Sequence, residues 1–264
     1  MSIVVFTKST PDTAAKVEVG GDGAVTWGNA QLIMSPWDEY AVTEATLLKD
    51  AHQVKAVVMA IGPELHNDAL KSALAIGLDE AVRIWDETME GQDSLGYAVA
   101  AAAAIKKLGD VDLILFGREQ IDVATDAHVY QLARKLGWPV IGAVSKILAV
   151  DFAGKTIKVE RAIEEGKQTV TAKLPAVLSV LKDINEPKSP SFIGIRKASK
   201  AVIPAWTSAD LGIGAAAAGE SAKVKTVEYR NLPQRAGTVN IIEGADEREK
   251  AEKLAAKLLE EKVI

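Results

Sequence analysis

The first 140 residues alternate short apolar runs with segments of helical periodicity, and this pattern limits the fold more than any other feature of the chain. It is typical of βαβ units, which build a mainly parallel, Rossmann-like sheet with helices on both faces. The predicted strands are Ile3–Thr7, Lys55–Ile61, Ala81–Trp85 and Asp112–Phe116. The predicted helices are Asp38–Ala51, Leu65–Ile76, Ser94–Leu108 and Thr125–Leu136, the last three closed by glycines 77, 109 and 137. We therefore predict an α/β fold.

The remainder of the chain predicts an extension of this sheet and a separate tail. Strand-like runs at Lys146–Val150, Thr156–Ile163 and Gln168–Val180 are expected to extend the sheet in an antiparallel sense, and Lys16–Trp27 is expected to form an inserted hairpin. The segment Gly212–Gly219 has the composition of a linker; a strand, Val224–Tyr229, and an amphipathic helix, Ala245–Lys262, are predicted after it. The organisation is thus a domain over 1–211 and a linker with a C-terminal arm over 212–264.

Composition and charge exclude several classes of function. The 264 residues contain no cysteine and three histidines without ligand spacing, which argues against a metal centre. A formal net charge of -5 argues against a nucleic-acid surface. No apolar run approaches the roughly 20 residues of a membrane span, and the first residues have neither signal-peptide nor transit-peptide character. We expect the chain to stay where it is made, in a bacterial cytoplasm or, if a transit peptide was removed, in the mitochondrial matrix.

The residues after the fourth predicted strand are the first candidate binding site. Ligands of open parallel sheets bind beyond the carboxyl ends of the strands, and free N–H groups at a helix start favour a phosphate. The segment Gly117–Asp122 lies in such a place, and Asp122, Thr125 and Asp126 could bond a ribose or cap the next helix. An adenine nucleotide is one interpretation, and Asp122 as a simple N-cap is the other. The sequence contains no recognisable catalytic arrangement.

A second candidate is the helix start Ser35-Pro36-Trp37-Asp38-Glu39, which has an N-cap, a proline at the first helical position and acidic residues in the first turn. Trp37 either stacks on the ring of a ligand or packs against the entry of its own helix.

A third candidate is the segment 185–200, in which two prolines stiffen the backbone ahead of a cluster of basic residues. Phe192 is predicted to stand at the tip of this loop, where it would anchor a partner protein. The alternative is a plain surface connection whose Phe192 folds back onto the core. The candidate docking residues are Asn185, Glu186, Pro187, Lys188, Phe192, Arg196 and Lys197.

Several of these segments, in this order along nearly the whole chain, resemble the small (β) subunit of electron transfer flavoprotein. The motifs are Ser35-Pro36-Trp37-Asp38-Glu39, Gly62-Pro63, Ala73-Leu74-Ala75-Ile76-Gly77, Asp112-Leu113-Ile114-Leu115, Asp122 with Gly137-Trp138-Pro139, Leu174-Pro175-Ala176-Val177 and Asn185-Glu186-Pro187-Lys188. The resemblance implies an adenine nucleotide hydrolase-like sheet. It also implies a larger α subunit that holds most of the FAD, and electron transfer from dehydrogenases to a quinone-linked acceptor without bond-making catalysis.

The resemblance also implies cofactor-binding positions and roles. An AMP site would include Phe6, Ser35, Pro36, Trp37, Asp38, Ile61, Gly117, Gln120, Ile121, Asp122, Val123, Ala124, Thr125, Asp126, Ala127 and His128. Trp37 takes the place of an aromatic residue near the flavin ring, Phe192 takes that of a leucine that anchors partner dehydrogenases, and the C-terminal arm would embrace the large subunit.

The chain departs from the family pattern in the nucleotide loop. Ala124 and Ala127 stand where the family has an acid and a glutamine, so two polar side chains are missing and the site is expected to be weakened. AMP, a second FAD or no ligand remain open for it. Arg161 is kept, but Ala162 replaces the acid that usually follows it.

Two other functions are compatible with the sequence. The chain could belong to an electron-bifurcating complex that oxidises NADH, which would carry two FAD per heterodimer. It could also be a free-standing adenine-nucleotide-binding domain without flavin, which would purify alone.

Overall fold

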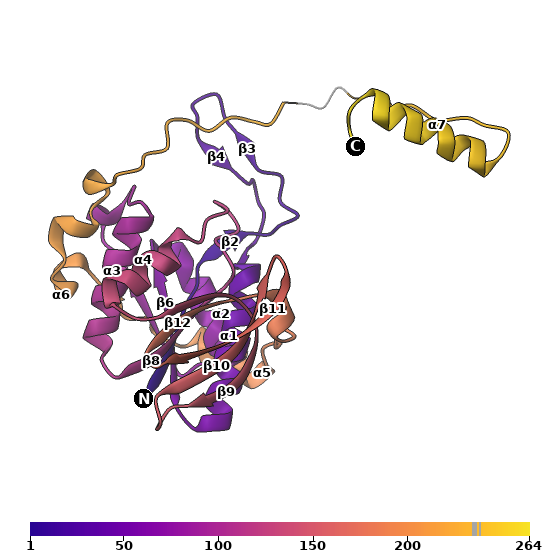
Figure 1. The fold of residues 1–264 in the computed structure, drawn as a ribbon. Helices are drawn as coiled ribbons and strands as arrows, with labels where there is room; N and C mark the ends of the chain where they lie inside the picture. Colours follow the sequence, from indigo (N-terminus) through magenta and orange to yellow (C-terminus); the bar gives the residue numbers. More distant parts are fainter. Residues whose placement is uncertain (234–236, 238) are drawn as a thin grey trace.

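The computed structural model describes residues 1–233, 237 and 239–264 (Figure 1). The strands are β1 Ser2–Phe6, β2 Ser9–Pro11, β3 Glu18–Val19, β4 Val25–Thr26, β5 Leu32–Met34, β6 Lys55–Ile61, β7 Glu80–Ile84, β8 Val111–Phe116, β9 Val140–Asp151, β10 Thr156–Ile163, β11 Gly166–Lys173, β12 Ala176–Val180 and β13 Ala205–Trp206. The helices are α1 Pro36–His52, α2 Asn67–Ile76, α3 Ser94–Leu108, α4 Ala127–Leu136, α5 Phe192–Ser199, α6 Ser208–Leu211 and α7 Glu247–Glu260.

The main sheet has nine strands within the described residues, in the order β11-β10-β9-β12-β8-β1-β6-β7-β13. The strands from β12 to β13 are parallel to their neighbours, and β9, β10 and β11 form the antiparallel extension that the sequence predicts. Every residue of β1 and β8 is buried, as expected for strands covered on both faces. The predicted α/β fold is confirmed.

Helices cover both faces of the sheet because successive strand residues point to opposite sides. Ile3 and Val5 of β1 belong to the core cluster that includes residues of α1 and α2, whereas Val4 and Phe6 belong to the cluster that includes residues of α3 and α4. The chain therefore changes face after β7, and β1, with β8 on one side and β6 on the other, marks the point where the strand order reverses. Binding sites of open α/β sheets lie beyond the carboxyl ends of the strands at such a point.

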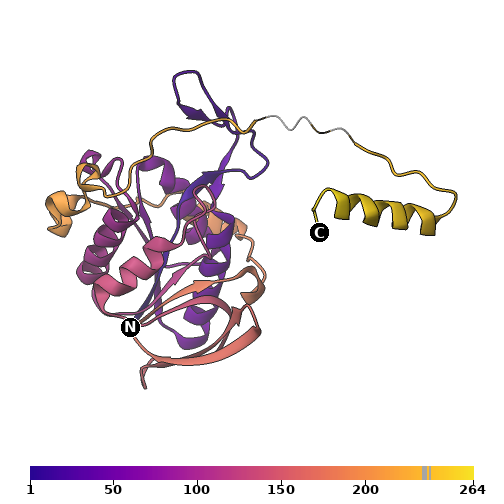
Figure 2. The ribbon, with the colours of Figure 1, turned by 45° about the horizontal axis from the view of Figure 1, so that its top comes forward.

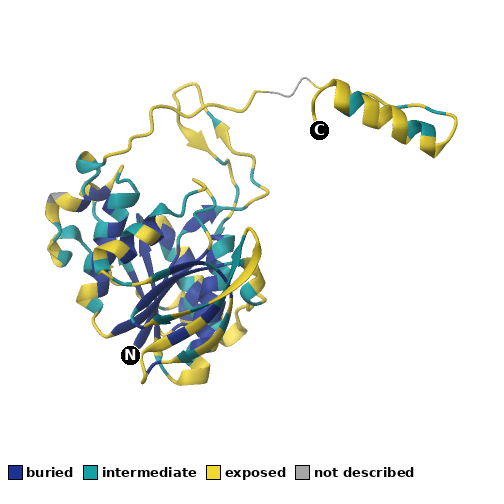
Figure 3. Cartoon of the chain, viewed as in Figure 1, coloured by how far each residue is buried: buried dark blue, intermediate teal, exposed yellow. Residues whose placement is uncertain are grey.

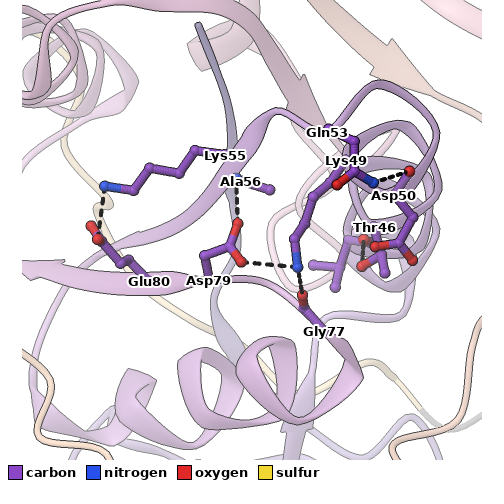
Figure 4. A network of polar contacts seen from close by, with 10 residues as sticks. Thr46, Lys49, Asp50, Gln53, Lys55, Ala56, Gly77, Asp79 and Glu80 are labelled. Atoms are coloured by element: carbon purple, nitrogen blue, oxygen red, sulfur yellow. Dashed lines mark hydrogen bonds and ion pairs between the residues drawn. The ribbon is translucent and has the colours of Figure 1, made fainter.

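A polar network holds the sheet together at the end where β6 and β7 begin (Figure 4). The Lys49 ammonium near the end of α1 donates to the Gly77 carbonyl at 2.8 Å and pairs with Asp79 at 2.9 Å. Asp79 also accepts the N–H of Ala56, while Lys55 pairs with Glu80 across the starts of β6 and β7. Because this network lies where the strands begin, it stabilises the sheet at the end away from the candidate site.

The structure corrects the predicted strand Gln168–Val180, which is in fact two strands. Pro175 has no N–H to contribute to a strand ladder, and β11 ends before it while β12 begins after it. Instead of continuing the antiparallel ladder, β12 inserts between β8 and β9 and is parallel to both. Burial explains this position, because all five residues of β12 are apolar or small and are fully covered.

The tail also differs from its prediction. The segment Gly212–Gly219, predicted as a linker, forms a compact turn, and Ala217 is buried against α3. No strand is found among the described residues of Val224–Tyr229, which is extended and exposed (Figure 3). The only regular element described beyond this segment is α7, which lies apart from the sheet in both ribbon views (Figures 1 and 2) and has no buried residue. None of the described helices has the length and apolar character needed to cross a membrane.

Candidate functional site

The site is built where β1 and β8 end side by side and α1 begins. Gly117 directly follows β8, and a Cβ at this position would lie 2.5 Å from the backbone carbon of Trp37. Glycine is therefore required for α1 to approach the strand end this closely. In this arrangement the Asp38 carboxylate accepts the Gly117 N–H at 3.3 Å and the Thr7 hydroxyl at 3.2 Å. The first turn of α1 is thus fastened to the ends of both strands.

Four aromatic rings pack together beneath these strand ends. Phe6 of β1 stacks on Phe116 of β8 with ring centroids 5.0 Å apart and an angle of 5° between the planes. His128 of α4 meets Phe116 edge-on at 5.3 Å, and Tyr97 of α3 meets His128 edge-on at 5.1 Å. Such tilted pairs add stability beyond the area they bury. The cluster joins two strands and two helices of one face of the sheet.

Burial shifts the titration of the charged and polar groups in this region. It raises the pKa of Asp38 to about 7, because the desolvation of the carboxylate outweighs the hydrogen bonds from Thr7 and Gly117. It lowers the pKa of both His66 and His128 to about 4, and it raises the pKa of Tyr97. At neutral pH the two histidines are therefore uncharged.

Asp38→Asn is expected to change the pH dependence of stability. The unfolded carboxyl has a pKa near 3.9, so as pH rises from about 4 to 7 the unfolded state loses its proton while the folded state keeps it. Wild-type stability should fall across this window relative to Asp38→Asn, by about 1.4 kcal/mol for each pH unit at most. The measurement is the difference in Tm between variant and wild type from pH 5 to 8.

Asp86→Asn provides the matched control for this experiment. Hydrogen bonds from Ser208 and Thr88 lower the pKa of Asp86 to about 2, so that both its folded and unfolded states are ionised above pH 5. Its Tm difference from wild type should stay constant over the same range. An equally constant difference for Asp38→Asn would show that the carboxyl is ionised in the folded protein at pH 5.

The loop after β8 is tied to the loop after β1. Lys8 pairs with Asp122 at 2.7 Å, and Gln120 bridges to Thr125 so that the loop closes on itself. His66 lies beside this pair, and its Nδ1 accepts the Ser9 N–H at 3.1 Å. Asp122 therefore makes an ion pair within the chain, and no capping hydrogen bond from it to α4 is found among the described contacts.

The structure brings together some, but not all, of the predicted cofactor-binding residues. Those that line one small pocket are Phe6, Asp38, Gly117, Gln120 and His128. Ser35 is buried at the start of α1, Ile61 lies in the core on the α3 side, and Asp122, Val123 and Ala124 are exposed. The remaining predicted residues, all partly exposed, are Pro36, Trp37, Ile121, Thr125, Asp126 and Ala127.

The same pocket has five lining residues that are not among the predicted cofactor-binding residues, namely Thr7, Lys8, Tyr97, Phe116 and Glu119. The sequence does point to Thr7 and Lys8, because Thr7 ends the first predicted strand and Lys8 directly follows it. It does not point to Tyr97, which lies within an alanine-rich helix with no local sign of a site.

Trp37 is half-buried at the first turn of α1. The guanidinium carbon of Arg118 lies 5.4 Å from the centroid of its ring, within the range of a cation–π contact. The indole is therefore neither buried in the core nor fully exposed to solvent.

The segment 185–200 is held rigidly but is not the extended loop that the sequence predicts. The Asn185 amide donates to the Tyr40 carbonyl at 3.0 Å and to Glu44 at 2.9 Å, so this residue binds α1. The Lys188 N–H donates to the Thr43 hydroxyl at 3.0 Å. The helix α5 begins at Phe192 because the Ser191 hydroxyl accepts the Gly194 N–H and serves as its N-cap.

The packing of α5 decides the position of Phe192. At Gly194 a Cβ would lie 2.2 Å from the Ala75 carbonyl oxygen, so this face of α5 lies directly on the end of α2. Ala198 is buried on the same side, and Phe192 and Ile193 point away from the protein, 93% and 83% exposed. Phe192 does not fold back onto the core. Glu186, Pro187, Arg196 and Lys197 are exposed as well.

These features define an α/β protein whose sheet is of the kind that binds ligands at its strand ends, with an exposed apolar helix start beside α2. Residues 26–211 match the model of the electron transfer flavoprotein domain, and the chain belongs to the electron transfer flavoprotein family. Beta subunits of this family are electron-transfer proteins that pair with an alpha subunit.

Curated relatives support this assignment over the full length of the chain. The electron transfer flavoprotein subunit beta of Clostridium acetobutylicum is 33% identical over 264 residues, which cover all of both chains. The Caffeyl-CoA reductase-Etf complex subunit CarD of Acetobacterium woodii is 32% identical over 265 residues, again covering both chains completely. Protein FixA of Azorhizobium caulinodans is 31% identical over 217 residues, 81% of this chain and 77% of its own length.

Proposed function

We propose that this chain is the small subunit of a heterodimeric electron transfer flavoprotein, which carries electrons from dehydrogenases such as acyl-CoA dehydrogenases to a quinone-linked acceptor. The observation that supports it most is the start of α5, which exposes Phe192 and Ile193 on a helix whose other face packs on α2. An exposed apolar anchor beside the basic Arg196 and Lys197 suits a partner that must bind briefly and in one orientation. The proposed location is the bacterial cytoplasm.

In this proposal FAD is held mainly by the large subunit and supplies the redox chemistry when bound. This chain would contribute a wall of the flavin site at the start of α1. Trp37 offers a half-buried aromatic face there, and Arg118 packs over its ring and restricts its rotation. The indole would exclude water from one side of the flavin.

The flavin count tests the assignment. We expect heat-denatured heterodimer to release one FAD per complex, and the small subunit purified alone to release none. Two FAD per heterodimer would support the alternative of an electron-bifurcating, NADH-oxidising complex, and the similarity to a subunit of a Caffeyl-CoA reductase-Etf complex is the reason to test it. A small subunit that is stable and nucleotide-loaded without any flavin-bearing partner would support the free-standing domain instead.

A further inference from the structure

The AMP site implied by the family resemblance does not fit this chain. We propose that the cleft at the ends of β1 and β8 is filled by the protein's own side chains, with Tyr97 and His128 occupying the space of a nucleotide base. The cleft therefore holds no AMP. This inference concerns the nucleotide cleft alone, and it holds whether or not the redox assignment does.

The remaining space is the first argument. The pocket lined by Phe6, Tyr97, Phe116 and His128 has a volume of about 10 Å³. Small-molecule pockets measure roughly 300–1,000 Å³, and a single water needs about 10–15 Å³. This pocket can accept a water molecule at most, and a purine ring could enter it only if side chains moved.

The aromatic contacts show which side chains would have to move. Phe6 and Phe116 are strand residues that stack on each other, with relative exposures of 1% and 2%. Tyr97 and His128 enter from α3 and α4. They meet each other edge-on, His128 also meets Phe116 edge-on, and Tyr97 makes a tilted contact with Phe6 at 6.1 Å. Moving Tyr97 or His128 would break these packed contacts, so ligand entry would require a rearrangement of well-packed rings.

Charge opposes a phosphate at the same place. Lys8, the cation that lines the pocket, is paired with Asp122 at 2.7 Å. Glu119 also lines the pocket, and the depressed pKa of His128 leaves the imidazole uncharged at neutral pH. A phosphate dianion would have to displace Asp122 from Lys8 and approach Glu119. Ala124 and Ala127 offer no polar side chain that would compensate.

AMP content and AMP-dependent stability test the proposal on the purified complex. Wild-type complex should release no AMP above trace on heat denaturation, and millimolar AMP should leave its Tm unchanged. The double variant Tyr97→Ala/His128→Ala removes the two filling side chains and should lower the Tm by about 5 °C or more. Added adenosine, which carries the base without the phosphate, should restore part of this loss, because a ligand that binds only the folded state stabilises it.

Control experiments distinguish the emptying of the cleft from a general loss of protein stability. Tyr97→Phe keeps the ring and should behave as wild type, without AMP and with no response to it. Inorganic phosphate should not rescue the double variant, since the predicted gain comes from the base. Stoichiometric AMP in wild type, or a wild-type Tm that rises with AMP, would overturn the proposal. A double variant that folds but does not respond to adenosine would contradict it too, and if that variant fails to fold, the wild-type measurements still decide. The expected count of one FAD per heterodimer does not depend on these results, whereas a second FAD bound in this cleft would overturn the filling as well.

Discussion

A chain that ends at Pro233 is expected to keep its fold and to lose its large subunit. The truncation removes α7 and the segment before it, in which Val239 and Ile241 are 88% and 82% exposed and no described residue is buried. Burial of apolar side chains is the main driving force for association. With about 2 kcal/mol or more for each well-buried anchor, the loss of several should weaken pairing by roughly 1,000-fold or more. Co-purification of tagged small subunit with the flavin-bearing chain measures it.

The position of the cut follows from the structure. Ala217 is buried against α3, and the Asn231 side chain exchanges two hydrogen bonds with the Val19 backbone of the inserted hairpin, at 2.8 and 2.9 Å. A cut after Leu211 would also remove these contacts, so that a loss of pairing could not be distinguished from a loss of stability of the small subunit itself. The full-length variant Arg248→Ala, which removes only an exposed ion pair with Glu252, is the matched control and should still pair. A yellow, stable heterodimer from the truncated chain would show that the arm is dispensable.

Phe192→Ala is expected to slow electron transfer from the partner dehydrogenase by about tenfold or more. Truncation of a buried aromatic anchor typically costs ~2 kcal/mol or more, and about 1.4 kcal/mol corresponds to a factor of ten. Because Phe192 is 93% exposed in the free chain, its removal should leave the Tm, the flavin content and chemical reduction by dithionite unchanged. Stopped-flow reduction of the flavin by the reduced dehydrogenase measures the effect.

Leu148→Ala is the matched control for this variant. Leu148 is also exposed, at 42%, but it lies on β9, outside the segment 185–200. Its removal should not alter the rate of transfer. A Phe192→Ala complex that transfers electrons at the wild-type rate would reject the docking role of α5, and a lowered Tm would reveal a structural role that the exposure of Phe192 does not predict.

The sequence by itself determined the parallel part of the sheet and its helices. The stretches Ala56–Ile61 and Leu113–Phe116 within the predicted strands are apolar throughout, as expected for strands covered on both faces. The ends of the helices were also determined by the local sequence, since Gly77 and Gly137 follow α2 and α4 as predicted. The residues after β8 could be identified as a candidate site because ligands of open parallel sheets bind beyond the carboxyl ends of the strands.

The tertiary structure decided the features that depend on contacts between distant segments. The sequence of residues 185–200 predicts a stiff exposed loop. Instead, the hydrogen bonds of Asn185 to α1 and the close packing of Gly194 on α2 place Phe192 at the start of an outward-facing helix. Likewise, Tyr97 and His128 are 31 positions apart, on separate helices, and only their packing brings the two rings together. Local patterns specify which backbone conformation a segment prefers, whereas the filling of a cleft depends on side-chain volumes contributed by several elements, which no single segment contains.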